Sequence, residues 1–431
     1  MSIKIYKFGG ASVKDAEGIK NVASIIQQYN HKNLVIVISA SGKTTNQLEN
    51  LVNAHFKNDN SVNEILEHIK QYHLGICAKL FDNKKHDIFN QLNEIFVEIE
   101  WLLEENETRI EQFDYVYDQM VSMGEMLSSK IVSAYLNEIQ LNNIWLDARD
   151  FIKTDNTYRE AKILWDETKQ AVQNYIHPYI GKSILITQGF VGCTSENFTT
   201  TLGREGSDYT GAILAWALNA ESETIWKDVP GVLNADPRLF KNTIKLDKLS
   251  YTEAIEMTYY GAQVIHPKTI QPLQNKNIPL HVRSFIEPKG NGTIIDENEP
   301  ETILPPIIVL KKAQILLHIS TRNFSFVTED NLSNIFSLIA KHKVKVNMMQ
   351  QSAIRFSICC DNIEQRINAL LKDLENEYSV LVSAQVELLN LRHSNDDNVK
   401  KVIGENKVLM RGEYGNTMQI VIAQFNSISD L

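Results

Sequence analysis

The chain has few of the residues that would cross-link it or anchor it in a membrane. Only four of its 431 residues are cysteine, too few for a disulfide framework at this length. Cys359 and Cys360 are adjacent and lack the two-residue gap that zinc sites favour, so reduced thiols are expected. Pure apolar runs such as Leu34–Ile38 are far shorter than a membrane span. With no apolar signal segment at the N-terminus either, we expect a soluble, cytoplasmic protein without a membrane partner.

Positive charge is also in short supply. The 43 Lys and Arg residues against 53 Asp and Glu residues give a formal net charge of −10, which argues against nucleic acid as a partner. Hydrophobic residues make up 43% and charged residues 22% of the chain, ordinary values for a globular protein. The length predicts two or three domains. Prolines and glycines gather between 287 and 306, where we place a domain boundary at about 303.

Strand and helix patterns alternate through the first 300 residues. Ile3–Lys7 reads as a strand, 15–28 as an amphipathic helix and Leu34–Ile38 as a strand that is apolar on both faces, as in a buried parallel sheet. Further strand signals lie at 144–146, 183–186, 223–226 and 279–282, and further helices are expected over 62–108, 115–137 and 250–260. We therefore predict an α/β fold for residues 1–300, a doubly wound and mostly parallel sheet covered by helices on both faces.

Beyond the domain boundary at about 303, the order of the predicted elements changes. The pattern runs strand (315–320), helix (331–342), strand (345–349), strand (354–359), helix (363–375) and strand (380–391). This βαββαβ order is that of an α+β, ferredoxin-like unit. A shorter strand, helix, strand, strand series follows to 425. Residues 307–431 are thus expected to hold a first unit at about 313–388 and a shorter second unit at about 389–425.

Two glycine-containing segments are candidate phosphate loops. Gly42-Lys43-Thr44 has the end of a P-loop, but the glycine that such a loop needs five residues earlier is replaced by Val37. No G-x-G-x-x-G motif is present, so a Rossmann dinucleotide site has no support. In Lys7-Phe8-Gly9-Gly10 a strand delivers a lysine, and the glycines allow backbone amides to approach an anion ahead of a helix. Glycines in a tight strand-to-helix turn can equally serve a steric purpose, and both interpretations stay open.

Two further features carry alternatives. The polar run 199–208 precedes an apolar helix; it is either an anion cradle in which Arg204 offers a planar fork to a carboxylate, or a cap in which Ser207 or Asp208 begins the helix. Glu125 lies in a helix whose neighbouring positions on that side are small or apolar. It therefore either faces a cleft or is a solvated helix position.

Taken together and in order, several segments resemble aspartate kinases of the amino-acid-kinase family. They are KFGGASV (7–13), SASGKTTN (39–46), SMGEMLSS (122–129), ITQGFVG (186–192), TTTLGREGSDYT (199–210), WKDVPGVLNADPR (226–238), YYGAQVIHPKT (259–269) and IPLHVRSF (278–285). The resemblance covers residues 1 to about 295. The remainder resembles the paired ACT regulatory domains of the same enzymes.

The resemblance implies transfer of the ATP γ-phosphoryl group to the β-carboxylate of L-aspartate. The product would be 4-phospho-L-aspartate, at the entry to lysine, threonine and methionine biosynthesis. A carboxylate is already ionised at pH 7 and needs no general base. It needs relief from repulsion, which Lys7, Mg²⁺ and the amides of Gly9 and Gly10 would supply.

The family match also assigns roles residue by residue. Arg204 would bind the α-carboxylate of aspartate and Glu125 its α-amino group, while Asp208 would orient Lys7. The rest of the expected substrate site is Ser39, Thr45, Glu205, Gly206 and Ser207. The expected ATP site is Lys7, Phe8, Gly9, Gly10, Lys227, Asp228, Leu233, Arg238, Gln263 and Val264. No residue of the chain is expected to ligate a metal on its own.

Several positions depart from the family pattern. Lys227 stands where Thr is usual, Glu205 where Gly is usual and Gln263 where Lys is usual, and we expect Lys227 to replace part of the charge lost at Gln263. In the tail, Asn347 stands where lysine-sensitive relatives have Asp, and the loop 326–330 lacks glycine. Lysine is therefore doubtful as the effector, with threonine or no effector as alternatives. We expect a homodimer joined through the tails.

Two rival functions remain open on sequence alone. One is a sibling kinase that acts on glutamate, acetylglutamate or a nucleotide. The other is a catalytically weak amino-acid sensor that has kept the fold.

Overall fold

The structure, a computed structural model, describes residues 2–29, 33–104, 112–262, 265–300, 303–323, 325–423 and 429–430. The chain forms two compact units. Unit 1 comprises Met1–Val232, Asp247–Ile255 and Ile265–Glu299, and unit 2 comprises Leu233–Leu246, Glu256–Val264 and Pro300–Leu431. Two segments from within the first 300 residues thus group with the C-terminal part, which no sequence pattern indicated.

Unit 1 is built on a mostly parallel sheet, as the sequence predicts. Among the described residues its strand order is β3-β4-β2-β1-β7-β10-β11-β9, and β10 and β11 are paired antiparallel. The strands are β1 (Lys4–Phe8), β2 (Leu34–Ile38), β3 (Asn143–Trp145), β4 (Ile184–Gln188), β7 (Ser222–Lys227), β9 (Lys248–Ser250), β10 (Leu280–Ser284) and β11 (Thr293–Asp296). A small antiparallel pair, β5 (Val191–Cys193) with β6 (Thr199–Thr201), lies beside it. All five residues of β2 are buried, as expected for an inner parallel strand.

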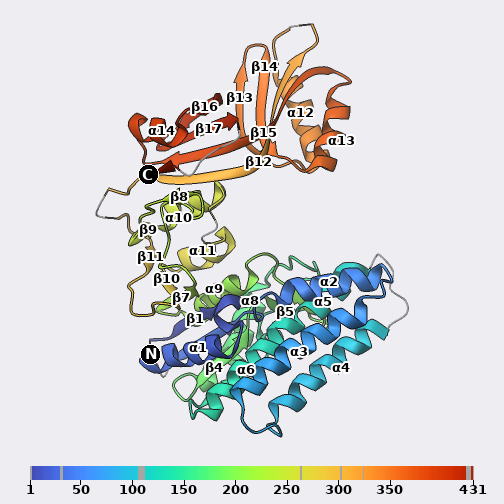
Figure 1. Cartoon of the computed structure of the whole chain (residues 1–431), viewed down its shortest axis with the longest axis vertical. Coiled ribbons are helices and arrows are strands. Elements are labelled where there is room, and N and C mark those ends of the chain that lie inside the picture. The colour runs from blue at the N-terminus through green and yellow to red at the C-terminus, as the bar shows by residue number, and fades with distance from the viewer. Residues whose placement is uncertain are drawn as a thin grey trace. The chain divides into compact units, whose positions relative to one another are not determined.

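Helices cover the sheet, and several pack on one another (Figure 1). They are η1 (Gly10–Val13), α1 (Ala16–Tyr29), α2 (Thr44–Phe56), α3 (Val62–Leu80), α4 (Ile88–Glu104), α5 (Phe113–Val121), α6 (Met123–Glu138), α7 (Ala148–Phe151), α8 (Trp165–Tyr175), η3 (His177–Tyr179), α9 (Gly206–Leu218) and α11 (Pro267–Gln274). Helix α10 (Tyr251–Tyr259) is divided between the units. No helix in the described ranges is long and apolar enough to cross a membrane.

Two expected helices differ from the prediction. The helical pattern over 62–108 forms α3 and α4, and the residues after Glu104 lie outside the described ranges. The single helix expected over 115–137 is wrong, because α5 and α6 meet at Ser122. The Ser122 hydroxyl donates to the carbonyl of Gln119 at 2.9 Å, and such a bond to the preceding turn bends helices.

Unit 2 contains a six-stranded antiparallel sheet in the order β13-β14-β12-β15-β17-β16 among the residues described. Its elements are β12 (Ile307–Thr321), α12 (Glu329–Lys341), β13 (Val346–Ser352), β14 (Arg355–Asp361), α13 (Glu364–Leu374), β15 (Tyr378–Arg392), α14 (Asp396–Ile403), β16 (Val408–Tyr414) and β17 (Thr417–Ala423). The short strands β8 (Phe240–Lys241) and β18 (Ser429–Asp430) form a further pair. The predicted ferredoxin-like order is confirmed for the first of its two halves.

The long strands β12 and β15 explain why the second half looked short. Ile307–Lys311 of β12 pairs with the end of β15, and Gln314–Thr321 pairs with its beginning. The pairing shifts register between these stretches, where Ala313 and Gln385 adopt positive φ angles. Each long strand therefore belongs to both halves. The second half looked short because one of its strands, Ile307–Lys311, precedes the first half in the sequence.

Three apolar cores lie among the described residues of unit 2. One lies under α12 and α13, and another is built from the six strands themselves. The third joins α14 and the ends of the long strands to Ala235 and Phe240 from the early segment 233–246. This packing is the physical reason why that segment groups with unit 2.

Candidate active site

Two loops lie side by side where β1 and β2 end. These strands are adjacent and parallel, with Lys7 level with Val37, so the chain leaves both at the same edge of the sheet. The amide of Gly42 donates to the carbonyl of Gly10 at 3.0 Å. A Cβ on Gly10 would lie 2.6 Å from the Ala40 carbonyl oxygen, whereas one on Gly9 would meet only ordinary contacts. Glycine is therefore sterically required at 10 and not at 9.

The same two loops contain buried hydroxyl groups with no partner. Ser12 and Ser41 are each 0% exposed, and neither Oγ has a hydrogen-bond partner among the described residues. Buried polar groups are normally satisfied, so an unpaired pair of this kind indicates a place where a polar ligand or water completes the bonding. It supports the cradle interpretation of the Lys7–Gly10 segment beside the steric one.

A compact ion cluster stands next to the loops. Lys7 Nζ lies 2.5 Å from Asp208 Oδ1, and Lys227 Nζ lies 3.6 Å from Asp208 Oδ2. Burial by itself raises the pKa of Asp208, but the charges of Lys7 and Lys227 outweigh it and hold the pKa below its ordinary value. Asp208 is thus an ionised carboxylate in the first turn of α9, shared by two ammonium groups. The three residues carry one net positive charge.

Glu125 is buried in the first turn of α6, so its interpretation as a solvated helix position is wrong. Its Oε1 accepts from the Ala40 amide at 3.3 Å, and its Oε2 has no partner in the described structure. Burial raises the pKa of Glu125 to about 8, against smaller opposite effects of the amide bond and of Lys7. The neighbouring Ser128 hydroxyl donates to the Ser39 carbonyl at 2.8 Å, which ties α6 to the loop after β2.

Asp118 anchors strand β6, which leads into the loop before α9. This α5 carboxylate accepts from the amide of Thr201 at 2.8 Å and from its hydroxyl at 2.6 Å, and also from the Arg159 amide. Asp118 was not among the residues that the sequence singled out, although it lies seven residues before Glu125. Beyond the anchored strand β6, Arg204 is exposed and Ser207 is buried.

Glu205 has a structural task at the start of α9. It is the residue before the helix and has a φ of 55°, in the left-handed region that favours glycine. Its side chain does not cap α9; instead Oε2 accepts from the backbone amide of His266 at 2.9 Å, next to α11. Because Glu205 is the cap position and α9 begins at Gly206, the alternative of Ser207 or Asp208 as the cap is wrong.

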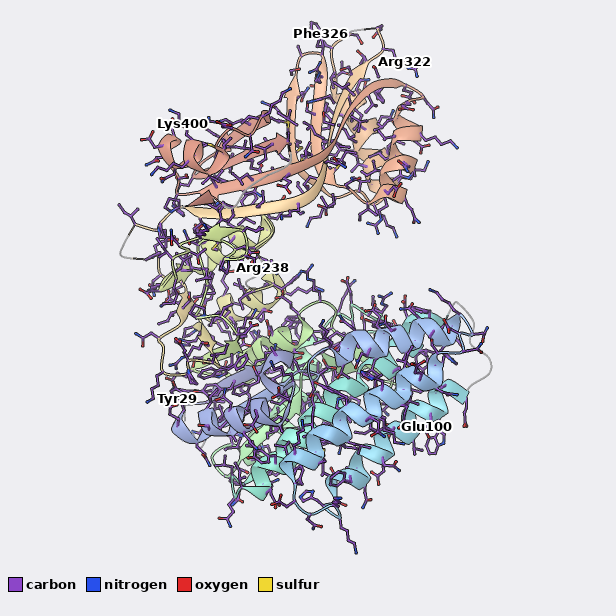
Figure 2. The ribbon with its side chains drawn as sticks, in the orientation of Figure 1. Tyr29, Glu100, Arg238, Arg322, Phe326 and Lys400 are labelled. Carbon is purple, nitrogen blue, oxygen red and sulfur yellow. The ribbon has the colours of Figure 1, made fainter. Side chains whose placement is uncertain are left out.

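The remaining expected residues fall into four groups. Phe8 stacks on Trp226 with ring centroids 5.9 Å apart, so its side chain is packed in the core and only its backbone is available. Asp228 is exposed, and Thr45 is half-buried in the first turn of α2. Leu233 and Arg238 belong to unit 2, where Arg238 pairs with Asp236 at 2.7 Å and is exposed (Figure 2). Gln263 and Val264 lie outside the described residues.

Comparison with known proteins identifies this arrangement. Residues 2–284 match the amino acid kinase family, the class that the parallel sheet and the lysine-bearing loop indicate. Lysine-sensitive aspartokinase 3 of Escherichia coli (strain K12) is 30% identical over 393 residues, which are 89% of this chain and 85% of that protein. The chain belongs to the amino acid kinase family and, within it, to the aspartokinases.

Solved structures agree over nearly the whole length. E. coli aspartokinase III in complex with aspartate and ADP has a TM-score of 0.79 at 27% identity, covering 97% of this chain and 96% of that one. The same enzyme in complex with lysine and aspartate has a TM-score of 0.80 at 26% identity, covering 98% and 96%. The similarity therefore extends through the C-terminal unit as well as the kinase fold.

Proposed function

We propose that this chain is an ATP-dependent aspartate kinase, which transfers the γ-phosphoryl group of ATP to the β-carboxylate of L-aspartate. The product is 4-phospho-L-aspartate, and the reaction is the first step of lysine, threonine and methionine biosynthesis. The observation that carries the proposal is the Lys7–Asp208–Lys227 cluster near Glu125, whose Oε2 has no partner among the described residues. The membership of the aspartokinases supports the same conclusion.

The cluster supplies what this reaction needs. The attacking carboxylate is ionised at neutral pH, so the barrier comes from bringing an anion toward a polyanion. Lys7 and Lys227 share one carboxylate and keep one net positive charge for the phosphates. The backbone amides around Gly9 and Gly10 and the unpaired hydroxyls of Ser12 and Ser41 can donate to phosphate oxygens.

Mg²⁺ fits this donor set through the nucleotide. Magnesium ions keep several waters and bind through one or two carboxylates plus substrate phosphates, without a protein cage. No group of three or more His, Cys, Asp or Glu side chains suited to a metal ion occurs in the described ranges, so the phosphates would contribute most of the ligands. The ion would neutralise phosphate charge, and Lys7 would act beside it.

Aspartate would be held by its two other groups. The exposed guanidinium of Arg204 is free to form a bidentate pair with the α-carboxylate. The unpaired Oε2 of Glu125 is suited to the α-ammonium group, whose positive charge would favour ionised Glu125. Ser39 lies in the loop after β2, Thr45 in the first turn of α2 and Ser207 in the first turn of α9. We assign these three hydroxyl groups polar contacts to substrate and phosphate.

The regulation and the oligomeric state of the chain are further proposals, which rest on fewer observations. The C-terminal unit resembles that of an aspartokinase solved with lysine, and we propose an amino-acid effector site there. In this chain the side-chain oxygen Oδ1 of Asn347 accepts from Lys311 Nζ at 2.6 Å, and the side-chain Nδ2 of Asn347 donates to Asp361 Oδ1 at 2.8 Å. Because both ends of Asn347 are engaged by the chain itself, we propose that free lysine is not the effector, leaving threonine or none. We also propose a cytoplasmic homodimer.

The structure of the segment 326–330 also bears on the proposed effector site. The loop expected over 326–330 is shorter than predicted, since Glu329 and Asp330 form the first turn of α12 with Thr328 in a capping box. Phe326 is exposed ahead of this helix (Figure 2).

The test is coupled ADP release from Mg-ATP with L-aspartate, in which hydroxylamine traps the acyl phosphate. Hydroxamate from the wild-type enzyme and a large loss in Arg204→Ala are expected. The matched control is Arg355→Ala, which removes another exposed arginine, on β14 of unit 2, and should leave turnover unchanged. Turnover with glutamate instead would establish a sibling kinase. Absence of turnover with retained effector binding would establish a sensor.

A further inference from the structure

Glu223 is a fully buried acidic residue on β7 that has no role in the site described above. It is level with Ile5 on β1 and with Leu280 on β10. Side chains alternate along a strand, so Glu223 and Lys227 share one face of β7. Lys7 is level with Ile225, two residues after Glu223, and points to the same face. Helix α9 packs over β1 and β7. Under this helix, Glu223 lies further from the carboxyl ends of the strands than the Lys7–Asp208 pair.

The space for this carboxyl is provided by a glycine. Gly211 follows Asp208 by three residues on α9, about one helical turn. A Cβ built on Gly211 would lie 2.1 Å from Glu223 Oε1 and 3.0 Å from its carboxyl carbon. These distances are too short for any side chain at 211 while Glu223 stays in place. Glu223 and Gly211 therefore form a matched pair between β7 and α9.

The surroundings of Glu223 favour the neutral form of its carboxyl group. It is 0% exposed, and neither oxygen has a hydrogen-bond partner within the described part of the chain. An ionised carboxylate in such a place would be strongly unfavourable. Burial and then the charge of Asp208 raise the pKa of Glu223 well above its ordinary value, and the charge of Lys7 offsets only part of this. The titratable groups that face it are thus Lys7 on β1 and Asp208 on α9, with Lys227 further along its own strand; β10 presents Leu280.

We propose that Glu223 is a positioning residue of the phosphoryl-transfer site, which in its neutral form leaves the Lys7–Asp208–Lys227 cluster with one net positive charge for the nucleotide phosphates. Loss of the Glu223 proton would bring the total charge to zero and draw Lys7 away from the nucleotide. Glu223 touches neither substrate nor phosphate and acts through Lys7. The role in catalysis rests on the proposed kinase function, but the effect on nucleotide affinity does not require turnover.

The first test measures ATP affinity by calorimetry from neutral to alkaline pH. In the wild type we expect the Kd to rise on the order of tenfold as Glu223 ionises, the size expected for one nearby unit charge. Glu223→Gln keeps the shape and stays neutral, so its Kd should change no more than about twofold over the same range. Glu387→Gln, at a buried carboxyl of unit 2, is the control and should retain the wild-type rise. An unchanged rise in Glu223→Gln would overturn the proposal.

Two measurements keep the proposal testable if Glu223→Gln does not fold. In Glu125→Gln, which lacks the other buried carboxyl that is protonated at neutral pH, the infrared carbonyl band of a buried carboxylic acid should disappear over the pH range in which ATP affinity falls; no such band at neutral pH would contradict the proposal. Gly211→Ala should lower stability and ATP affinity, and adding Glu223→Val should restore stability because the methyl group enters the vacated space. Additive losses in the double variant would refute the matched pair.

These results also separate the two proposals. Failure to phosphorylate aspartate, with the pH-dependent ATP affinity intact, would overturn the function and leave the role of Glu223 standing.

Discussion

At the scale of single residues, three buried carboxyl groups of unit 1 behave differently because their neighbours differ. The positive charges of two lysines stabilise the ionised form of Asp208. Asp118 accepts several hydrogen bonds, yet burial still raises its pKa to about 6. Glu125 has one amide donor and an unpaired oxygen, and its pKa is raised further. The protonation state of each follows from the balance of burial, charge and hydrogen bonds.

Arg204→Ala should weaken aspartate binding by about 2–5 kcal/mol, as when one partner of a charge pair is removed. The KM for aspartate should rise far more than the KM for ATP. Arg204→Lys should recover only part of the loss, since an ammonium group cannot form the bidentate pair. Steady-state kinetics with each substrate varied in turn measures this, and an unchanged KM for aspartate in Arg204→Ala would contradict the assigned role.

The affinity for aspartate should depend on pH through Glu125. In the free protein its pKa is about 8, so below that pH the carboxyl is protonated and must lose its proton to pair with the substrate ammonium. Affinity should therefore rise with pH, by up to about tenfold per unit for one proton released, and level off above the pKa. Glu125→Gln should bind weakly at every pH and lose the slope. Calorimetry in buffers of different ionisation enthalpy counts the released proton, and binding without proton release would argue against this pairing.

Glu205→Gly should have two opposing effects. Glycine relieves the left-handed backbone at 205, worth about 1 kcal/mol, but removes the acceptor for the His266 amide. We expect overall stability to stay within about 1 kcal/mol of the wild type. Hydrogen exchange at the His266 amide should become faster. Unchanged exchange there would mean that the Glu205 bond does not hold this segment in solution.

At the scale of elements, the joint in β12 is a point of strain. Ala313 has a φ of 54° where the register shifts, and its carbonyl accepts from the Asn362 amide. Ala313→Gly should raise the free energy of unfolding by up to about 1 kcal/mol, because glycine adopts this conformation without steric penalty. Ala313→Val should destabilise by more than that amount. Urea unfolding measures both, and a destabilised glycine variant would show that the joint is unstrained.

At the scale of the whole molecule, the order of the chain and the division into units do not coincide. Ala235 and Phe240 lie in the core of unit 2 with Ile308, Leu389 and Ile420. A fragment ending at 299 would keep Phe240 but lose the strands that cover it. We expect such a fragment to bind a hydrophobic dye and to aggregate, unlike the full chain. A monodisperse fragment without dye binding, judged by light scattering, would mean that 233–246 packs differently on its own.

Much of the fold could be predicted from local patterns. The strands at 34–38 and the helix at 16–29 lie close to their predicted limits, because apolar spacing alone reports which faces must be buried. The break at Ser122 was missed, since a hydroxyl bond to the preceding turn leaves no mark in the apolar spacing. The short appearance of the second C-terminal half had a similar cause: its missing strand, 307–311, is distant in sequence.

The sequence by itself determined the fold class, the family and the chemical types at the site, because these depend on residue order and local periodicity. Only the tertiary structure decided which charges meet. It placed Lys227 and Lys7 on one carboxylate, buried Glu125 beside Ala40 and set Glu223 against Gly211. The reason is that burial and Coulomb energy depend on distances between elements far apart in the chain, which no local pattern encodes.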